Sequence, residues 1–208
     1  MDPLQLMVEL TMKNERDIDE HLMTLFSLVI SLKPTKVVEL GVRTGRSTLA
    51  FLVASQYVKC SLTSVDINDM APDFRFPEDW KENWKFIKKD ALAYLERDFQ
   101  ILMADRKEGD PILVYIDDWH DGLHVQKELD LIDEYITPGD LIVLHDLMYG
   151  NSQPHYKTEE DPKDKQWGNG GPYKPISELD LSVWEYVTIP RCNGLTILRR
   201  KSDKIVTE

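Results

Sequence analysis

The chain has 208 residues, of which 42% are hydrophobic, so it can bury one sizeable core and is too short for two comfortable domains. Its 37 acidic residues outnumber its 25 basic ones, and the net charge of −12 disfavours nucleic acid as a partner. The sequence has no apolar run long enough to span a membrane, no signal-peptide core at the N-terminus and only two cysteines, so we expect a cytoplasmic location and no membrane partner.

Helical and extended patterns alternate along a single predicted domain covering residues 1–208. Apolar spacing predicts a helix over about 16–32, within a helical N-terminal segment of residues 1–35. Short apolar segments predict strands over 37–40, 61–66, 84–87, 111–116 and 141–144. Helices are predicted between them over 48–58, from the capping residue Asp90 to Phe99, and over 122–136. This alternation predicts a doubly wound α/β fold with a mostly parallel sheet.

The end of the chain follows another pattern. Segments 183–189 and 195–199 read as strands, and only a short turn containing Asn193-Gly194 joins them, so they are predicted to form an antiparallel hairpin. A seven-stranded sheet results. Residues 150–180 are polar and show no periodicity, which is typical of a functional or a disordered loop, and we expect a substrate or lid loop there.

Residues 36–48 form the most informative segment. A strand ending near Glu39 runs into a turn with Gly41 and Gly45, and then into a helix. An acid at the mouth of the turn suits a cationic or hydroxyl-rich ligand better than a phosphate. Arg43 and Arg46 also break the glycine spacing of dinucleotide-binding folds. An ordinary strand-to-helix turn with an incidental glutamate is the alternative interpretation.

The pattern E-x-G-x-x-x-G resembles motif I of class I S-adenosylmethionine-dependent methyltransferases. The resemblance implies S-adenosylmethionine as cofactor and a seven-stranded sheet that ends in an antiparallel hairpin. It assigns the amino acid part of the cofactor to the residues of this motif, which are Glu39, Gly41, Val42, Thr44, Gly45 and Ser47.

Acidic residues close or follow several predicted strands, where ligands of doubly wound sheets bind. Asp66 is expected to accept hydrogen bonds from the ribose, although it could instead cap the following turn. By the family pattern Asp90 accepts from the adenine amino group, and it can cap a helix at the same time. Asp117 is assigned to both the cofactor and the metal. Acidic side chains gathered at this one edge of the sheet would repel each other unless a cation lay among them.

Two further segments make the resemblance more specific. Ile116-Asp117-Asp118-Trp119-His120-Asp121 is similar to the L-D-x-W-K-D segment of catechol O-methyltransferases, and Leu144-His145-Asp146 resembles the second metal-binding segment of that family. The latter is closer still to the cephalosporin-hydroxylase-type and macrolide-sugar O-methyltransferases. The resemblance implies a divalent metal such as Mg²⁺ at Asp117, His145 and Asp146, with His120, or failing that His145, as the catalytic base.

His145 and Leu147 depart from these family patterns. Leu147 replaces a metal-binding Asn of the catechol enzymes, and His145 replaces an acid of the sugar enzymes. Because imidazole suits transition metals better than magnesium, three alternatives stay open. The metal is not magnesium, or His145 is a base instead of a ligand, or no metal binds. Among the other histidines, His124 is expected to face solvent, and His155 could reach a substrate.

These observations predict an S-adenosylmethionine-dependent O-methyltransferase that acts on a hydroxyl of a small molecule, with possible metal assistance. A non-catalytic module that binds S-adenosylmethionine is the first alternative. A nicotinamide-dependent oxidoreductase is the second, and the missing G-x-G-x-x-G motif and the terminal hairpin argue against it. The acceptor is not identified, and a homo-oligomer is possible.

Overall fold

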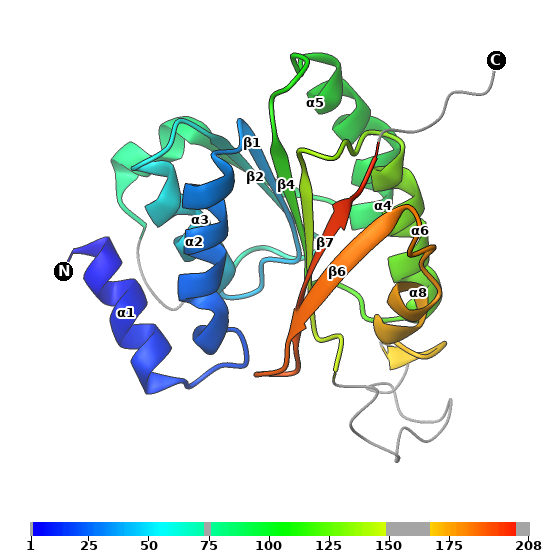
Figure 1. The fold of residues 1–208 in the computed structure, drawn as a ribbon. Coiled ribbons are helices and arrows are strands. Elements are labelled where there is room, and N and C mark those ends of the chain that lie inside the picture. Colours follow the sequence, from blue (N-terminus) through cyan, green and yellow to red (C-terminus); the bar gives the residue numbers. More distant parts are fainter. Residues whose placement is uncertain (1, 73–75, 149–166, 203–208) are drawn as a thin grey trace.

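A computed structural model describes residues 2–72, 76–148 and 167–202. In these ranges seven strands form one sheet in the order β3-β2-β1-β4-β5-β7-β6 (Figure 1). The strands are β1 (Lys36–Leu40), β2 (Ser61–Asp66), β3 (Trp84–Lys88), β4 (Ile112–Ile116), β5 (Leu141–His145), β6 (Trp184–Ile189) and β7 (Leu195–Arg200). Strands β1 to β5 are parallel, and β7 runs antiparallel to both β5 and β6.

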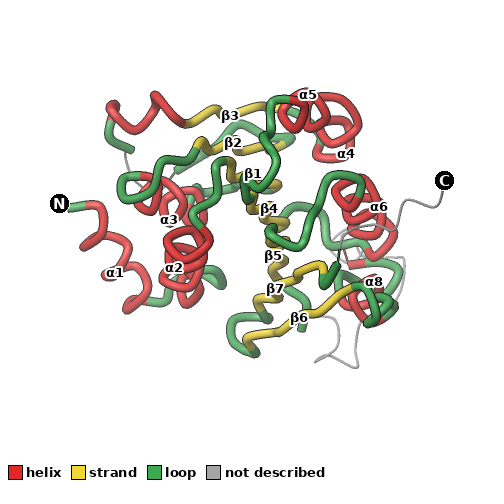
Figure 2. The backbone as a smooth tube through the Cα atoms, turned by 45° about the horizontal axis from the view of Figure 1, so that its top comes forward, coloured by secondary structure: helices red, strands yellow, loops and turns green. Residues whose placement is uncertain are grey.

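Helices cover both faces of the sheet (Figures 1 and 2). One face carries α1 (Pro3–Lys13), α2 (Leu22–Leu32) and α3 (Arg46–Ser55). The other carries α4 (Ala91–Tyr94), α5 (Gln100–Ala104), α6 (Gly122–Asp133) and α8 (Tyr173–Ser177). Short 3₁₀ turns form η1 (Asp19–His21) and η2 (Glu78–Asn83), and a π-helical turn, η3 (Leu95–Phe99), joins α4 to α5.

Strand β4 lies at the centre of the sheet and is buried along its whole length. Its residues alternate between the two hydrophobic cores, as the period of two along a strand requires. Ile112, Val114 and Ile116 pack on the side of α4 to α6. Leu113 and Tyr115 pack on the side of α1 to α3. Burial on both faces explains why this segment reads as a continuous apolar run.

The structure confirms the predicted fold class, including the antiparallel pair at the end of the chain. The predicted element boundaries differ by a few residues, and the N-terminal segment contains two α-helices joined by η1 instead of one helix over 16–32. The unpatterned stretch 150–180 was wrongly predicted to be loop throughout, because α8 lies within it. Pro175 is the third residue of that helix, where its missing N–H breaks no helical hydrogen bond. Residues 149–166, with His155, lie outside the described residues.

Within the described ranges, no helix combines the length and the apolar character that crossing a bilayer requires.

Candidate active site

The turn between β1 and α3 is built on a buried glutamate. The Glu39 carboxylate accepts hydrogen bonds from Ser47 Oγ at 2.6 Å, Thr48 Oγ1 at 2.8 Å and Ser64 Oγ at 2.5 Å. Glu39 is fully buried, so it ties the start of α3 to β2 from beneath the turn. Its direct contact with a cofactor stays a prediction, and its observed role is to fix the turn.

Asp66, the last residue of β2, holds the same turn from the side. Its Oδ2 accepts hydrogen bonds from the backbone N–H groups of Val42 at 2.9 Å and Arg43 at 3.0 Å, and its Oδ1 accepts one from Asn68 at 2.8 Å. The N–H of Gly41 donates to the Val65 carbonyl, and that of Gly45 to the Val42 carbonyl. Most N–H groups of the turn are therefore already bound within the protein. The ribose role of Asp66 stays a prediction.

Asp90 caps α4, because its carboxylate accepts a hydrogen bond from Ala93 N at 3.0 Å. The capping role was one of two roles expected for Asp90. Its contact with adenine stays a prediction.

Gly41 lies where the turn meets the loop that follows β4. Its φ of +88° is in the left-handed region, and a Cβ at this position would lie 2.2 Å from the carbonyl oxygen of Asp117. Gly45 also has a positive φ, of +74°, and precedes the first residue of α3. Only glycine fits at position 41 without displacing Asp117.

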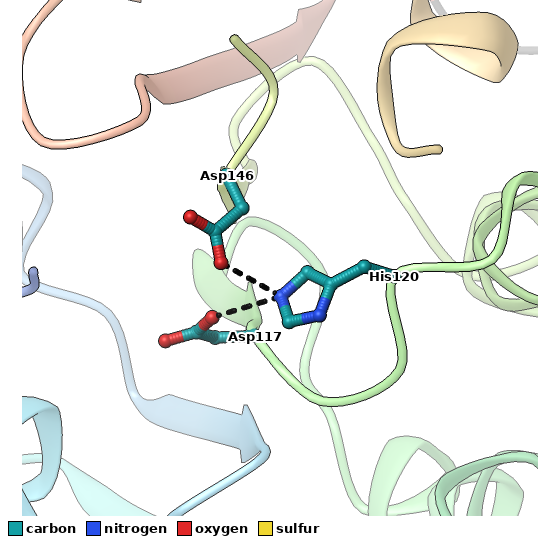
Figure 3. A group of neighbouring side chains, drawn as sticks. All are labelled: Asp117, His120 and Asp146. Carbon is teal, nitrogen blue, oxygen red and sulfur yellow. Dashed lines mark hydrogen bonds and ion pairs between the residues drawn. The ribbon is translucent and has the colours of Figure 1, made fainter. Parts of the chain in front are cut away.

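Asp117, His120 and Asp146 converge at the carboxyl ends of β4 and β5, which are neighbouring parallel strands (Figure 3). His120 Nε2 lies 2.9 Å from Asp146 Oδ2 and 3.4 Å from Asp117 Oδ1. Tyr115 donates a hydrogen bond to the other oxygen of Asp117 at 2.9 Å. The His120 ring stacks on Trp167, with ring centroids 4.2 Å apart. These contacts fix all three side chains around one point.

His145 supports this group from behind. Its Nδ1 lies 3.5 Å from Asp117 Oδ1 and 3.3 Å from Asp146 Oδ1, and its ring meets the edge of His21. Asp146 has a φ of +63°, a conformation that Asp tolerates better than most residues. His145 is 2% exposed, so its direct access to a substrate is small.

The charges of this group are strongly coupled. Burial disfavours a charged His120, but the neighbouring Asp117 and Asp146 outweigh it and raise the pKa of His120 to about 9. The same carboxylates raise the pKa of His145 well above its usual value. In turn, the two imidazoles keep the pKa of Asp117 and of Asp146 below the usual range despite burial. The imidazoles and the carboxylates therefore stabilise each other's charged forms.

The model of the rhamnosyl O-methyltransferase/CmcI family matches residues 12–192, which is most of the chain. The chain belongs to this family. It is therefore an S-adenosylmethionine-dependent O-methyltransferase, and the resemblance found in its motifs is confirmed. Family membership supports the enzyme over the binding module and the oxidoreductase.

Solved structures share the fold of this O-methyltransferase. The S-adenosylhomocysteine-bound methyltransferase PaMTH1 of Podospora anserina is 18% identical, over 97% of this chain and 89% of that one, with a TM-score of 0.62. An O-methyltransferase from Bacillus cereus, also in complex with S-adenosylhomocysteine, is 13% identical over 97% and 91%, with a TM-score of 0.62. A Mg-SAM complex of cmcI is 16% identical over 85% and 69%, with a TM-score of 0.52. No curated protein sequence matches the chain.

The donor set of this O-methyltransferase fits a divalent cation. One ligand atom from each of Asp117, His120 and Asp146 lies within 4.8 Å of the others. Asp146 Oδ1 is buried without a hydrogen bond from the described residues. The sequence predicted a metal group of Asp117, His145 and Asp146, whereas the convergent ligand atoms belong to Asp117, His120 and Asp146, so His120 takes the place expected for His145. Since imidazole nitrogen suits zinc, iron or nickel, this set fits one of these metals better than magnesium.

The sequence did not predict a second group of titratable residues, which contains Asp118, His124 and Glu128. His124 was expected to face solvent, and this was wrong: its Nε2 lies 3.2 Å from Asp118 Oδ2 and 3.6 Å from Glu128 Oε1. The neighbouring carboxylates overcome the effect of burial and raise the pKa of His124 to about 10. Burial, followed by the charge of Asp118, raises the pKa of Glu128 well above its usual value. The i, i+4 spacing of His124 and Glu128 on one helix was the available signal.

The buried Glu39 should make stability depend on pH. Burial raises its pKa to about 7 against an ordinary value of 4.5, so between these values the folded protein holds a proton that the unfolded chain has lost. The resulting stability is present below pH 4.5 and is lost as pH rises through 7. Relative to Glu39→Gln, the free energy of unfolding of the wild type should fall by about 3 kcal/mol over this interval.

Urea denaturation at several pH values checks this expectation. The exposed Glu96→Gln serves as the control and should follow the wild type. A constant difference between wild type and Glu39→Gln would contradict the raised pKa.

The contacts of Asp66 lead to an expectation about the cofactor. Asp66→Ala should weaken S-adenosylmethionine binding by about tenfold or more, because it frees the turn N–H groups and removes the proposed ribose acceptor. Isothermal titration calorimetry measures this, with Asp69→Ala as control, since the Asp69 side chain is 80% exposed. Equal affinities in the two variants would remove Asp66 from the cofactor site.

Proposed function

We propose that the protein transfers the methyl group of S-adenosylmethionine to a hydroxyl oxygen of a small molecule, beside a divalent metal held by Asp117, His120 and Asp146. The observation that carries this proposal is the close contact between the glycine turn (residues 41–45) and the metal-ligand group (Asp117, His120 and Asp146). The backbone of Gly41 approaches Asp117 so closely that a Cβ would lie 2.2 Å from its carbonyl oxygen. A cofactor on the turn and an acceptor beside Asp117 would therefore be neighbours.

The reaction breaks the bond between sulfur and methyl carbon, forms a bond between that carbon and the acceptor oxygen, and releases the hydroxyl proton to water. When bound, the metal would hold the acceptor oxygen and lower the pKa of its hydroxyl. The protein contributes mainly by placing the two reacting atoms in line. The cofactor would be held by the turn residues Gly41, Val42, Thr44, Gly45 and Ser47, together with Glu39, Asp66, Asp90 and Asp117.

His120 fits the role of a metal ligand better than that of the base. Its Nε2 faces the two carboxylates, and its ring is held between them and Trp167. A nitrogen placed in this way would bind the metal and so could not accept the hydroxyl proton. His145 has its Nδ1 toward the same carboxylates and would orient them, or complete the ligand set. A pH–rate profile that keeps its shape in His120→Gln would support the ligand role.

The acceptor is proposed to be a small hydroxylated molecule. A net charge of −12 argues against a nucleic acid acceptor. Trp167 belongs to the 150–180 segment that the sequence assigns to the substrate, and its stacking on His120 brings the described end of that segment to the metal-ligand group. This contact supports the role of the segment in binding the acceptor.

The test is a methyl-transfer assay with labelled S-adenosylmethionine and separate sugar and phenolic acceptors, each with Mg²⁺, Mn²⁺ or Zn²⁺. We expect S-adenosylhomocysteine to form in proportion to a methylated hydroxyl product. Transition metals should support the reaction at least as well as magnesium, because of the imidazole ligand. Tight cofactor binding with no transfer to any acceptor would overturn the small-molecule proposal.

A further inference from the structure

Asp118, His124 and Glu128 form a second group of ligand-type side chains, distinct from Asp117, His120 and Asp146. Asp118 lies on the loop after β4, and the other two lie on successive turns of α6. One ligand atom from each lies within 4.8 Å of the others. Since the proposed methyl transfer uses none of these three side chains, the reaction does not explain why they converge.

Glu128 has the least compensated carboxylate of this group. It is fully buried, and neither of its carboxylate oxygens accepts a hydrogen bond from the described residues. The buried Oδ1 of Asp118 also lacks such a partner. A buried carboxylate without a compensating charge or hydrogen bond costs a large free energy. We therefore expect a cation or a proton beside these oxygens. Both carboxylates point toward the same imidazole nitrogen.

The spacing of the donors matches a first-row metal ion. His124 Nε2 lies 3.2 Å from Asp118 Oδ2 and 3.6 Å from Glu128 Oε1. Ligand atoms at about 2.0–2.1 Å from a tetrahedral ion lie about 3.3 Å apart. Two carboxylates balance the charge of a divalent ion, and the imidazole favours zinc or a similar transition metal over magnesium or calcium.

We propose that Asp118, His124 and Glu128 bind a second divalent transition-metal ion, for which Zn²⁺ is the probe. The side chains of His124 and Asp118 keep 15% and 17% of their surface exposed, which leaves an entry path and a position for a water ligand. The ion would tie the loop after β4 to α6. Because Asp118 follows Asp117 directly, this tie would help to hold the proposed methyl-transfer site in place. The role is structural and does not depend on that site being loaded.

Zinc stoichiometry and affinity test the proposal. Protein stripped with a chelator is titrated with Zn²⁺ against a chromophoric competitor, and bound metal is counted by elemental analysis. We expect two ions in the wild type and one each in Glu128→Gln and Asp146→Asn. The double variant should bind none. At the second site, Glu128→Gln should weaken binding by about 100-fold or more, since even indirect changes around a metal reduce affinity by about 10–100-fold.

The control is Asp130→Asn, which removes an exposed carboxylate from the same helix and should still bind two ions. If Glu128→Gln does not fold, as judged by circular dichroism, His124→Gln replaces it. A full complement of two ions in a folded Glu128→Gln protein, or no zinc in Asp146→Asn, would overturn the proposal. If the proposed methyl-transfer site alone fails to bind metal, the wild type and Asp146→Asn will each bind one ion and Glu128→Gln none.

Discussion

Asp146→Asn should lower kcat/KM for methyl transfer by about a thousandfold and leave S-adenosylmethionine affinity within about twofold. Asp146 supplies a carboxylate to the metal-ligand group, and a cation bound there would lower the activation free energy by several kcal/mol. A change of about 4 kcal/mol in that free energy corresponds to a thousandfold change in rate. Among the described residues, none of the hydrogen bonds that hold the turn of residues 41–45 involves Asp146. Asn suits this substitution because it tolerates the positive φ of +63° at this position.

Steady-state kinetics and calorimetry measure the two quantities, and Asp69→Asn, at an exposed carboxylate, is the control. Excess EDTA should reproduce the loss in the wild type, and Mn²⁺ or Zn²⁺ should restore activity to the wild type but not to Asp146→Asn. Full activity in excess EDTA would exclude the metal and leave His120 and His145 as a metal-free acid–base pair.

Gly41→Ala should reduce the free energy of unfolding by about 3 kcal/mol or more and reduce methyl transfer as well. Two effects add at this position. A left-handed φ strains an alanine by about 1–2 kcal/mol, and overpacking against the Asp117 backbone adds about 1–3 kcal/mol. Because relief of the clash moves the Asp117 backbone, this proposed metal ligand would be displaced.

Gly109→Ala is the matched control for this substitution. Gly109 has a similar φ of +81°, but a Cβ there would meet no atom within 4 Å. It should therefore show the backbone strain alone, about 1–2 kcal/mol, with unchanged kinetics. Urea denaturation and kcat/KM for both variants separate strain from clash. Equal decreases in the free energy of unfolding of the two variants would show that the Asp117 backbone moves aside at little cost.

The order and type of most strands, and the convergence of Asp117 with Asp146, could be predicted from local sequence patterns. Apolar runs identify buried strands, and parallel strands place their carboxyl ends on one edge, so Asp117 and Asp146 were expected to converge. Their convergence follows from β4 and β5 being neighbours. The hairpin was predictable because a short connection permits only antiparallel pairing.

The contacts of His120, His124 and Glu39 could not be predicted in the same way. The position of His120 depends on the path of the loop after Asp117 and on Trp167, which is distant in sequence. The burial of His124 accompanies its contact with Asp118, which lies on the loop after β4. Glu39 looked like a residue at the mouth of the turn, but three hydroxyls from α3 and β2 hold it beneath. The contacts of His120 with Trp167, of His124 with Asp118 and of Glu39 with the three hydroxyls join separate segments of the chain, and no local period encodes them.

The hold of Asp66 on the glycine turn also determines what kind of ligand the turn can accept. The N–H groups of Gly41, Val42, Arg43 and Gly45 all donate within the protein. A phosphate group would find few donors here, and the nearby Asp66 carboxylate would repel it. The turn is therefore poorly suited to the anionic end of a nucleotide, and a ligand that binds beside Asp66 would need hydroxyl or cationic groups.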